Sequence, residues 1–366
     1  MSLYWNHRVK RLAPYIPGEQ IRDQRVIKLN TNENPYPPSP KVIEAIQKAL
    51  GDDLRLYPDP ACTELRTVIA QRYGVMPEQV FAGNGSDEVL AFAFAAFFES
   101  PVKNRQTLPI LFPDITYSFY PVYTRLWDIP FTPVPLAADF SLVIEDYKQA
   151  AGGVVIPNPN APTGQAIPCS DLRSLLAFHE KNRETAAVVL VDEAYTAFGR
   201  DLEVTPLVHE YSNLLTVHTL SKAASLAGLR VGFAIGNQEL IEGLGRVRDS
   251  FNSYTVDRLA QAGARAAILD ASYYEAVNRK VIATRNRVSA ALKALGYEVI
   301  PSQANFIFIR SLQKNGMQLY TFLREQDILV RHFNQLRIAD FLRVSIGTDE
   351  QMDRVLAACE TFSNGT

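Results

Sequence analysis

Short apolar runs alternate with helical patterns through the middle of the chain, and this alternation limits the possible folds more than any other property of the sequence. The runs span residues 109–112, 153–157, 187–191, 214–219 and 231–235. Strands that are apolar on both sides are typical of a parallel sheet with helices on both faces. Between them lie helix-start signals such as Ser39 followed by Pro40, which suit an N-cap and a first helical position. The pattern predicts an α/β fold.

The pattern changes near residue 271, where a long amphipathic helix is expected to run to Ala294. Short strands follow near Glu298 and over residues 305–309, 328–330 and 342–346. That order predicts a smaller α+β unit. We therefore predict a large domain over residues 30–265, with a mostly parallel sheet between helices, and a small domain formed by residues 1–29 and 266–366. The polar, proline-rich stretch from Asn30 to Pro40 is interpreted as a strap.

Charge and cysteine content exclude several classes of function. The 366 residues include 37 Lys and Arg against 39 Asp and Glu, a formal net charge of −2, with no long block of either sign. Neither nucleic acid nor an anionic membrane is therefore expected as a partner. The three cysteines, Cys62, Cys169 and Cys359, lack the spacing of metal ligands, so no metal site is predicted. Without a secretory signal or a membrane-spanning apolar stretch, the chain is expected to be soluble and cytoplasmic.

The segment Thr219-Leu220-Ser221-Lys222 follows an apolar run and precedes Arg230. A lysine at a strand end, with hydroxyls beside it and an arginine eight residues later, suits a cofactor that carries both an aldehyde and a phosphate. The amine of Lys222 can form an imine with the aldehyde, while Thr219, Ser221 and Arg230 can hold phosphate oxygens. Taken alone, Lys222 fits an exposed surface lysine better.

Asp192 changes that balance because it ends the apolar run Val188 to Val191. Open parallel sheets bind ligands at the carboxyl ends of their strands. A buried carboxylate there can keep a pyridine nitrogen protonated, so that the ring accepts electron density from a substrate carbon. Tyr195, three residues later, can donate to a ring hydroxyl. Taken alone, Asp192 fits a helix cap or a turn.

Two further turns follow apolar or strand-like segments. Gly83-Asn84-Gly85-Ser86-Asp87-Glu88 leads into a helical run, so that Gly85 lets the backbone approach an anion and Ser86 offers a hydroxyl at a helix start. Residues 157–164, Pro-Asn-Pro-Asn-Ala-Pro-Thr-Gly, can fix polar amides at the sheet edge. Each turn taken alone also fits an ordinary connection.

The order and spacing of these elements resemble the fold-type I pyridoxal-phosphate aminotransferases, the aspartate aminotransferase superfamily, over nearly the whole chain. The histidinol-phosphate aminotransferase family is the closer resemblance. The matching motifs are Leu29-Asn30-Thr31-Asn32-Glu33-Asn34-Pro35, Tyr57-Pro58-Asp59, Gly83 to Glu88, Val191-Asp192-Glu193-Ala194-Tyr195 and Leu342-Arg343-Val344-Ser345-Ile346-Gly347-Thr348.

The resemblance implies a role for each matching residue around pyridoxal 5′-phosphate. Lys222, Asp192 and Tyr195 are implied as the catalytic residues, and Tyr117 as the residue that stacks on the ring. The phosphate is implied to lie among Gly85, Ser86, Asp87, Thr219, Ser221 and Arg230, with Tyr57 reaching over from the second subunit of a homodimer. Where the family usually has Asn before Pro-Thr-Gly, this chain has Ala161. We assign the ring-hydroxyl contact of that Asn to the neighbouring Asn160.

Two arginines in the carboxy-terminal unit, Arg331 and Arg343, suit forked recognition of a carboxylate or a phosphate. Arg331 can also be read as a solvated strand end. The family implies Tyr15, Asn32 and Asn305 as further substrate-side positions. The expected reaction moves an amino group between L-histidinol phosphate and 2-oxoglutarate. The alternatives are an aromatic or broad-specificity aminotransferase, a threonine-phosphate decarboxylase, a cofactor-binding regulator of DNA and an α/β protein without a cofactor.

Overall fold

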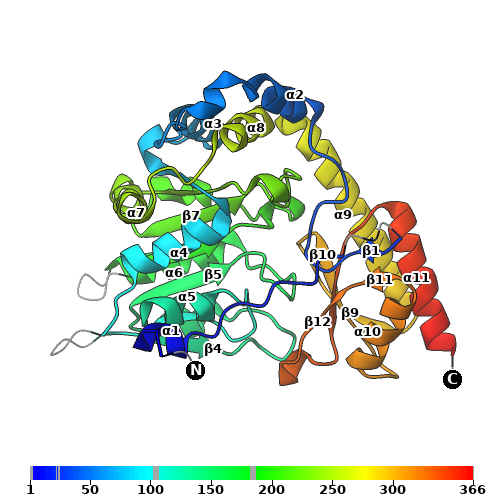
Figure 1. The fold of residues 1–366 in the computed structure, drawn as a ribbon. Helices are drawn as coiled ribbons and strands as arrows, with labels where there is room; N and C mark the ends of the chain where they lie inside the picture. Colours follow the sequence, from blue (N-terminus) through cyan, green and yellow to red (C-terminus); the bar gives the residue numbers. More distant parts are fainter. Residues whose placement is uncertain (1–2, 22, 24, 102–106, 182–186, 366) are drawn as a thin grey trace.

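A seven-stranded sheet forms the centre of the larger part of the molecule (Figure 1). The computed structural model describes residues 3–365 except 22, 24, 102–106 and 182–186, so the ends of the predicted domains at residues 1, 2 and 366 lie outside it. The strands, in spatial order, are β2 (Val80–Gly83), β8 (Gly232–Gly236), β7 (Leu214–Thr219), β6 (Val189–Asp192), β5 (Gly153–Pro157), β3 (Ile110–Pro113) and β4 (Phe131–Val134). Strands β7 to β4 are parallel, whereas β8 is antiparallel to both of its neighbours.

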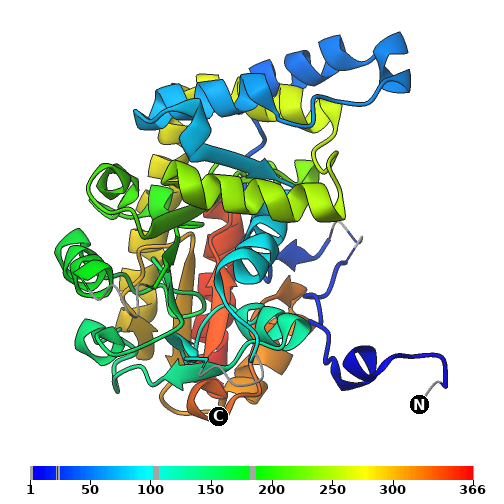
Figure 2. The ribbon, with the colours of Figure 1, turned by 90° about the vertical axis from the view of Figure 1, so that its left-hand side faces the viewer.

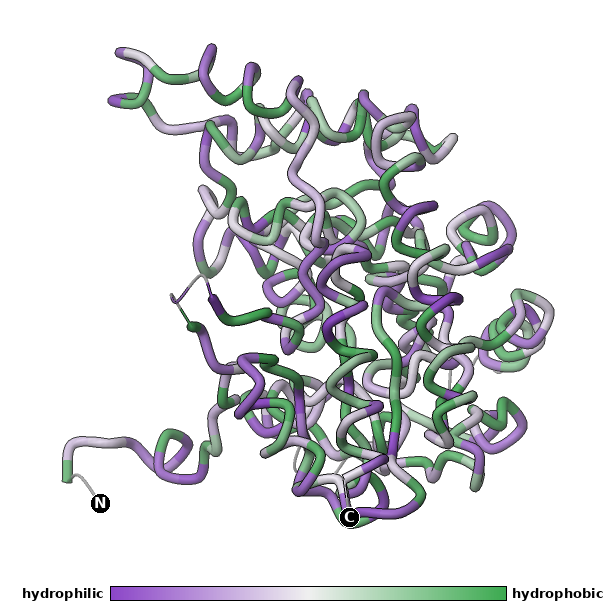
Figure 3. The backbone as a smooth tube through the Cα atoms, turned by 90° about the vertical axis from the view of Figure 1, so that its right-hand side faces the viewer, coloured by the Kyte–Doolittle hydropathy of each residue, from purple (hydrophilic) through white to green (hydrophobic). Residues whose placement is uncertain are grey.

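Both faces of this sheet are buried. Alternate residues of a strand point to opposite faces, and in β6 they belong to two different hydrophobic cores. Val189 and Val191 of β6 pack in one core with Leu172 of α6 (Cys169–Lys181), while Leu190 packs in another with Phe94 of α4 (Gly85–Phe97). Hydrophobic and hydrophilic stretches alternate along the outer helices, as Figure 3 shows. These helices are α2 (Pro40–Ala49), α3 (Thr63–Tyr73), α4 (Gly85–Phe97), α5 (Tyr120–Trp127), α6 (Cys169–Lys181), α7 (Gln238–Phe251) and α8 (Arg258–Leu269).

The carboxy-terminal part forms a second layered unit around an antiparallel sheet of four strands. Their order is β12 (Arg331–His332), β13 (Leu342–Ser345), β10 (Phe306–Ser311) and β9 (Tyr297–Ile300). The helices of this unit are α9 (Ala271–Ala294), α10 (Gly316–Glu325) and α11 (Asp349–Asn364). Helix α9 has the predicted bounds, and Val281 on it packs with Phe306 and Val355 in one core.

Single turns of 3-10 helix connect many of these elements. They are η1 (Asp52–Arg55), η2 (Pro77–Gln79), η3 (Ile144–Tyr147), η4 (Thr196–Phe198), η5 (Thr205–His209), η6 (Ala227–Leu229) and η7 (Leu336–Ile338). The start of α2 is the one the sequence predicts, with the Ser39 hydroxyl accepting from the backbone N–H of Lys41. Strand β4 was not predicted, because it contains Pro133 and lies at the sheet edge, where a missing N–H is tolerated.

The segment that precedes the strap contacts both units. Strand β1 (Ile27–Lys28) pairs with β11 (Ile328–Leu329), and Glu19 forms an ion pair with Arg324 of α10. Helix α1 (His7–Arg11) has no buried residue and projects from the body (Figure 2). Arg11 forms an ion pair with Asp128, the residue that directly follows α5. Glu19 and β1 therefore contact the small unit, whereas Arg11 of α1 contacts the large unit.

Candidate active site

A cavity of ≈ 290 Å³ opens at the carboxyl ends of β5, β6 and β7. Pro157 at the end of β5 pairs with Asp192 at the end of β6, and Asp192 pairs with Val217 of β7, so these three strands end side by side. Parallel strands place their ligand sites at this edge. Nine residues that the sequence predicts for the site line the cavity: Ser86, Asp87, Tyr117, Asp192, Tyr195, Thr219, Ser221, Lys222 and Arg230.

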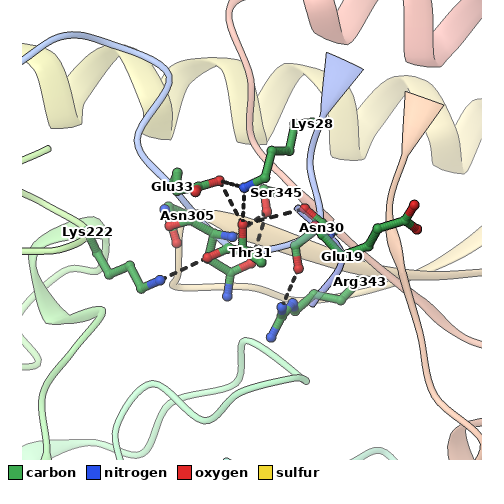
Figure 4. Close-up of polar contacts among 10 residues, drawn as sticks. Glu19, Lys28, Asn30, Thr31, Glu33, Lys222, Asn305, Arg343 and Ser345 are labelled. Atoms are coloured by element: carbon green, nitrogen blue, oxygen red, sulfur yellow. Dashed lines mark hydrogen bonds and ion pairs between the residues drawn. The ribbon is translucent and has the colours of Figure 1, made fainter. Parts of the chain in front are cut away.

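Lys222 enters this cavity from the turn after β7. Its Nζ donates to the carbonyl oxygen of Thr31 in the strap at 2.9 Å (Figure 4). The strap also holds the backbone of the lysine, because Asn34 Nδ2 donates to the Lys222 carbonyl at 3.1 Å. Burial, with the nearby positive charge of Arg343, lowers the pKa of Lys222 to about 8. A neutral, nucleophilic amine is therefore accessible near neutral pH.

Asp192 faces the same cavity and is buried. The Tyr120 hydroxyl donates to its Oδ2 at 2.8 Å, and the backbone N–H of Ala194 donates to its Oδ1 at 3.1 Å. Burial raises the pKa of Asp192 to about 6, against the opposite effect of these two donors. The carboxylate is thus ionised at neutral pH and suits a cationic nitrogen.

Tyr195 connects the cavity to the strap and to the small unit. Its hydroxyl accepts from Asn32 Nδ2 at 2.9 Å, and burial raises the pKa of Tyr195, so the phenol stays protonated and can still donate. Two residues hold Asn32 through three hydrogen bonds: its backbone N–H donates to Ser345 Oγ, its Oδ1 accepts from that hydroxyl, and its carbonyl accepts from Asn305 Nδ2. The left-handed conformation of Asn32, with φ 57°, is over-determined by these bonds.

The amino end of α4 forms the anion-binding side of the cavity. Asp87 in its first turn accepts from the Tyr117 hydroxyl at 2.7 Å and from Arg230 Nη2 at 2.9 Å. Gly85 suits this position because its φ of 81° is one that L side chains rarely adopt, and a Cβ would also lie 2.5 Å from Arg230 Nη2. Ser86 presents its side chain and the free N–H groups of the helix start to the cavity. This group of donors suits a phosphate.

Thr219, the last residue of β7, and Ser221, in the turn that follows it, complete this side. Both line the cavity, and the backbone N–H of Ser221 donates to Thr219 Oγ1 at 3.1 Å. Gly232 on β8 allows the sheet to approach α4, because a Cβ there would lie 2.3 Å from the backbone nitrogen of Ser86. Close packing of β8 on the start of α4 therefore brings the two anion-binding loops together.

Arg343, on β13 of the small unit, contacts the strap beside this site. Its Nη2 donates to the Asn30 carbonyl at 2.9 Å (Figure 4), and its guanidinium lies over the ring of Phe306 at 5.5 Å. Burial lowers the pKa of Arg343, yet its Nε has no partner among the described residues. The buried Oδ1 of Asn305 has none either. Buried polar atoms without partners are uncommon, so these two atoms are candidates to form hydrogen bonds with a bound ligand.

Two further predicted substrate residues lie close to this arginine. Arg331 of β12 is the register partner of Arg343 on β13, which places two guanidinium groups on neighbouring strands. The Tyr15 ring lies 4.2 Å from that of Phe119, and the phenol of Tyr15 is close enough to act on the charge of Arg343. Hydrogen bonds to the strap hold Arg343 and Asn305 beside the cavity, although none of the five predicted substrate residues is part of its lining.

Three predicted cofactor residues do not line this cavity: Asn160, Tyr57 and Gly85, the last of which directly precedes the lining residue Ser86. The buried Asn160 amide donates to the Ile115 carbonyl at 2.9 Å and to Thr163 Oγ1 at 3.2 Å, and Ala161 lines the cavity in its place. The geometry thus gives no support to the ring contact predicted for Asn160. Tyr57 is 78% exposed and stacks on Tyr254 at 4.6 Å, away from the cavity of its own chain.

Four residues at the cavity or behind it were not predicted from the sequence. Gln20, Thr31 and Glu33 line it from the amino-terminal segment and the strap, and Tyr120 holds Asp192 from behind. Glu33 also pairs with Lys28, and its charge acts on Lys222. The spacing of Tyr117, Tyr120 and Tyr123, three residues apart at a helix start, is a signal in the sequence that could have pointed to Tyr120.

Pyridoxal phosphate fits the residues present. The phosphate suits the start of α4 with Arg230, where Gly85 leaves space that a side chain would fill. The ring nitrogen suits Asp192, and the aldehyde suits the amine of Lys222, which burial keeps partly neutral. Among the described residues, no cluster of His, Cys, Asp or Glu side chains is placed to hold a metal ion, and every helix is too short or too polar to cross a membrane.

Comparisons with known proteins agree with this geometry. A sequence model of the family "Aminotransferase class I and II" matches residues 24–358. A curated relative from Bordetella parapertussis, "Histidinol-phosphate aminotransferase 1", is 54% identical over 98% of each chain. The "Histidinol-phosphate aminotransferase" of Clostridium acetobutylicum is 53% identical over 97% of this chain and 98% of the relative.

A solved structure extends the comparison to the fold. The histidinol-phosphate aminotransferase of Sinorhizobium meliloti, crystallised with pyridoxal 5′-phosphate, is 24% identical, with a TM-score of 0.86 and coverage of 99% of this chain and 98% of that one. At this identity the likeness concerns the fold, whereas the family model and the curated relatives concern the sequence itself. By that match, the chain belongs to the class I and II aminotransferases and, among them, to the histidinol-phosphate aminotransferase family.

Proposed function

We propose that this chain is a pyridoxal-phosphate aminotransferase that moves an amino group from L-histidinol phosphate to 2-oxoglutarate, with imidazole acetol phosphate and glutamate as products. The curated relatives that match nearly the whole chain are named histidinol-phosphate aminotransferases, which supports this donor and this type of reaction. The donor and the acceptor use one site in turn, so the first product leaves before 2-oxoglutarate binds. This reaction is a step in histidine biosynthesis.

Lys222 is the residue that bonds to the aldehyde of the cofactor and later moves a proton. Bound pyridoxal phosphate supplies this aldehyde and a ring that accepts the electron pair left at the substrate carbon. With the cofactor bound, the Nζ of Lys222, once free, would be the base that takes the proton from the substrate carbon and delivers it to the carbon that was the aldehyde carbon of the cofactor. A pKa lowered to about 8 suits this two-way task.

Asp192 and Tyr195 act on the ring. The ionised carboxylate of Asp192 keeps a proton on the pyridine nitrogen, so that the positive ring attracts electron density during the reaction. The protonated Tyr195 hydroxyl, which accepts from Asn32, has its own hydrogen free to donate to the ring oxygen. Asn32 therefore fixes the direction of this donor.

Arg343 and Arg331 are proposed to hold the anionic end of each substrate. Histidinol phosphate carries a phosphate ester and no α-carboxylate, whereas 2-oxoglutarate carries two carboxylates. A guanidinium forms forked hydrogen bonds with either kind of anion. The buried Nε of Arg343 and the buried Oδ1 of Asn305 support this role, because a ligand there would satisfy atoms that the described residues leave unpaired.

The active form is proposed to be a cytoplasmic homodimer. Tyr57 is too far from its own cavity to line it, yet it stands on an exposed apolar surface together with Leu54, which is 53% exposed, and Leu56, which is 46% exposed. An exposed surface of this kind is typical of a contact with another chain. We propose that Tyr57 completes the phosphate side of the partner's site.

The observation that carries the proposal is the meeting of Lys222, Asp192 and the anion-binding start of α4 in one cavity. Borohydride reduction of the protein loaded with pyridoxal phosphate, followed by peptide mapping, should label Lys222 and no other lysine. A panel of amino donors then tests the substrate: kcat/KM for histidinol phosphate should far exceed that for phenylalanine or tyrosine. Equal values would favour the broad-specificity alternative, and release of carbon dioxide from threonine phosphate would favour the decarboxylase.

A further inference from the structure

Three tyrosines on one turn-and-helix segment donate their hydroxyl groups to acidic residues at the site. Tyr117 donates to Asp87 Oδ1 at 2.7 Å, Tyr120 donates to Asp192 Oδ2 at 2.8 Å, and Tyr123 donates to the Asp87 carbonyl at 3.0 Å. The spacing of three residues places the three rings on one side of the segment that begins α5. The middle tyrosine is the one that reaches the carboxylate behind the ring position.

Tyr120 lies behind the site, where its hydroxyl contacts Asp192 and its ring contacts Tyr117. Its side chain is fully buried and is absent from the lining of the cavity. Its ring is fixed by Tyr117 at 5.6 Å, by Phe112 at 6.0 Å and by Phe94 at 6.2 Å, so the hydroxyl is held in one direction. Rigid aromatic packing therefore points this donor at a single oxygen of the carboxylate.

The hydroxyl also stays a donor over the whole working pH range. Burial and the charge of Asp192 raise the pKa of Tyr120 well above its usual value. The other oxygen of Asp192 accepts from the backbone N–H of Ala194, which no side-chain substitution removes. Tyr120 is thus the side-chain donor that balances the effect of burial on this carboxyl.

Resting on the proposed function, we propose that Tyr120 is a positioning residue that keeps Asp192 ionised and oriented toward the ring nitrogen of the cofactor. The lone pairs that the two donors leave free on the carboxylate then face the cavity. Loss of the hydroxyl leaves Oδ2 buried without a partner, and the carboxyl is then expected to take up a proton at higher pH. A neutral Asp192 no longer favours a protonated ring.

Other groups near Asp192 act in the opposite direction or are neutral. The Asp87 charge disfavours ionisation of Asp192, and the phenols of Tyr123 and Tyr195 and the carboxyl of Glu193 lie within its electrostatic range. Burial raises the pKa of Glu193 to about 8, so this neighbour is neutral at pH 7. None of these groups can replace the donor that Tyr120 supplies.

The test compares Tyr120→Phe with the wild type and with Tyr147→Phe, a matched control that also removes a fully buried hydroxyl, one without a partner among the described residues. Affinity of the apoprotein for pyridoxal phosphate is measured from pH 5 to 9. In Tyr120→Phe the pH at which affinity is half lost should rise by ~1 unit, since one hydrogen bond to a charged group is worth about one pKa unit. Tyr147→Phe should keep the wild-type midpoint.

A second measurement follows the carboxyl itself, without cofactor. The infrared band of protonated Asp192 is obtained in the apoprotein as the difference between each protein and its Asp192→Asn version, and its titration should move upward in Tyr120→Phe. An unchanged titration, or an equal loss of cofactor affinity when Tyr120→Phe is added to Asp192→Asn, would overturn the proposal in favour of a packing role. If the wild type takes up no pyridoxal phosphate, the proposed function fails, while the infrared titration still decides the role of Tyr120.

Discussion

The cofactor side and the substrate side of the site differ in whether their polar groups have hydrogen-bond partners within the chain. On the side predicted for the cofactor, the acidic groups are already paired within the chain: Asp192 with Tyr120, and Asp87 with Tyr117 and Arg230. On the side predicted for the substrate, the buried Nε of Arg343 and the Oδ1 of Asn305 have no partner in the described part of the chain. The cofactor stays bound throughout the reaction, so the polar groups around it can be paired within the protein. Two different substrates bind in turn on the other side, so that side needs polar atoms that each substrate can bond.

The two sides are also built from different parts of the fold. The cofactor side is built on the ends of the central strands and on the start of α4, elements whose places are fixed by the two cores on either face of the sheet. The substrate side is built by the strap and by the small unit, which meet the large unit through contacts such as Asn32 with Tyr195. Rigid elements hold a catalytic geometry more exactly than segments between two units.

Lys222→Ala tests the cofactor side with the largest expected effect. Without the amine, no covalent bond to the aldehyde forms and no base takes the substrate proton, so kcat should fall by roughly 10³-fold or more. Stopped-flow assays of each half-reaction measure the loss. Lys148→Ala is the matched control, because this lysine pairs with Glu145 on η3, far from the cavity, and its loss should leave kcat unchanged.

Asp192→Asn should lower kcat by roughly 10²-fold while the cofactor still binds at neutral pH. The pH dependence carries the sharper result. Burial raises the pKa of Asp192 to about 6, so the carboxylate gains a proton as the pH falls through that value and its attraction for a protonated ring is lost. Affinity of the wild-type apoprotein for pyridoxal phosphate should therefore drop below about pH 6.

The phosphate of the cofactor titrates in the same range. That step is common to both proteins, so the difference between the wild-type and Asp192→Asn affinity curves isolates the carboxylate. Identical curves would contradict the placement of Asp192 at the ring nitrogen.

The sequence predicted the cofactor side more fully than the substrate side, since nine predicted cofactor residues line the cavity. The family and the α/β fold expected from the motifs are confirmed, because strand ends carry Asp192 and Lys222 in a recognisable order. The contacts of Tyr120 and Thr31 were not predicted. Tyr120 lies 72 residues from Asp192 in the sequence, and Thr31 lies 191 residues from Lys222. Such contacts depend on how separate elements pack, which no local pattern encodes. The shift from Asn160 to Ala161 at the cavity has the same origin.

Arg343→Lys tests the incomplete side. Lysine keeps the charge but loses the planar fork, so KM for histidinol phosphate and for 2-oxoglutarate should rise by about 10- to 100-fold, with a smaller change in kcat. Cofactor affinity should stay close to that of the wild type. Arg310→Lys on the neighbouring strand β10 is the control, because this side chain pairs with Glu298 away from the site. A loss of cofactor affinity equal to the rise in KM would show that the two sides are not separate.

Tyr57→Phe carries the smallest expected effect, yet it decides whether the cofactor side is complete within one chain. If Tyr57 donates to the phosphate in the partner's site, the loss of one hydrogen bond should weaken pyridoxal phosphate binding by roughly 2- to 10-fold. Tyr254→Phe, which removes the hydroxyl of the ring stacked on Tyr57, should leave the affinity unchanged. Co-expression of the Tyr57→Phe chain with a Lys222→Ala chain then forms mixed dimers in which an intact Tyr57 serves an intact Lys222. Wild-type affinity at that site supports sharing between subunits, whereas a silent Tyr57→Phe means that each chain finishes its own phosphate side.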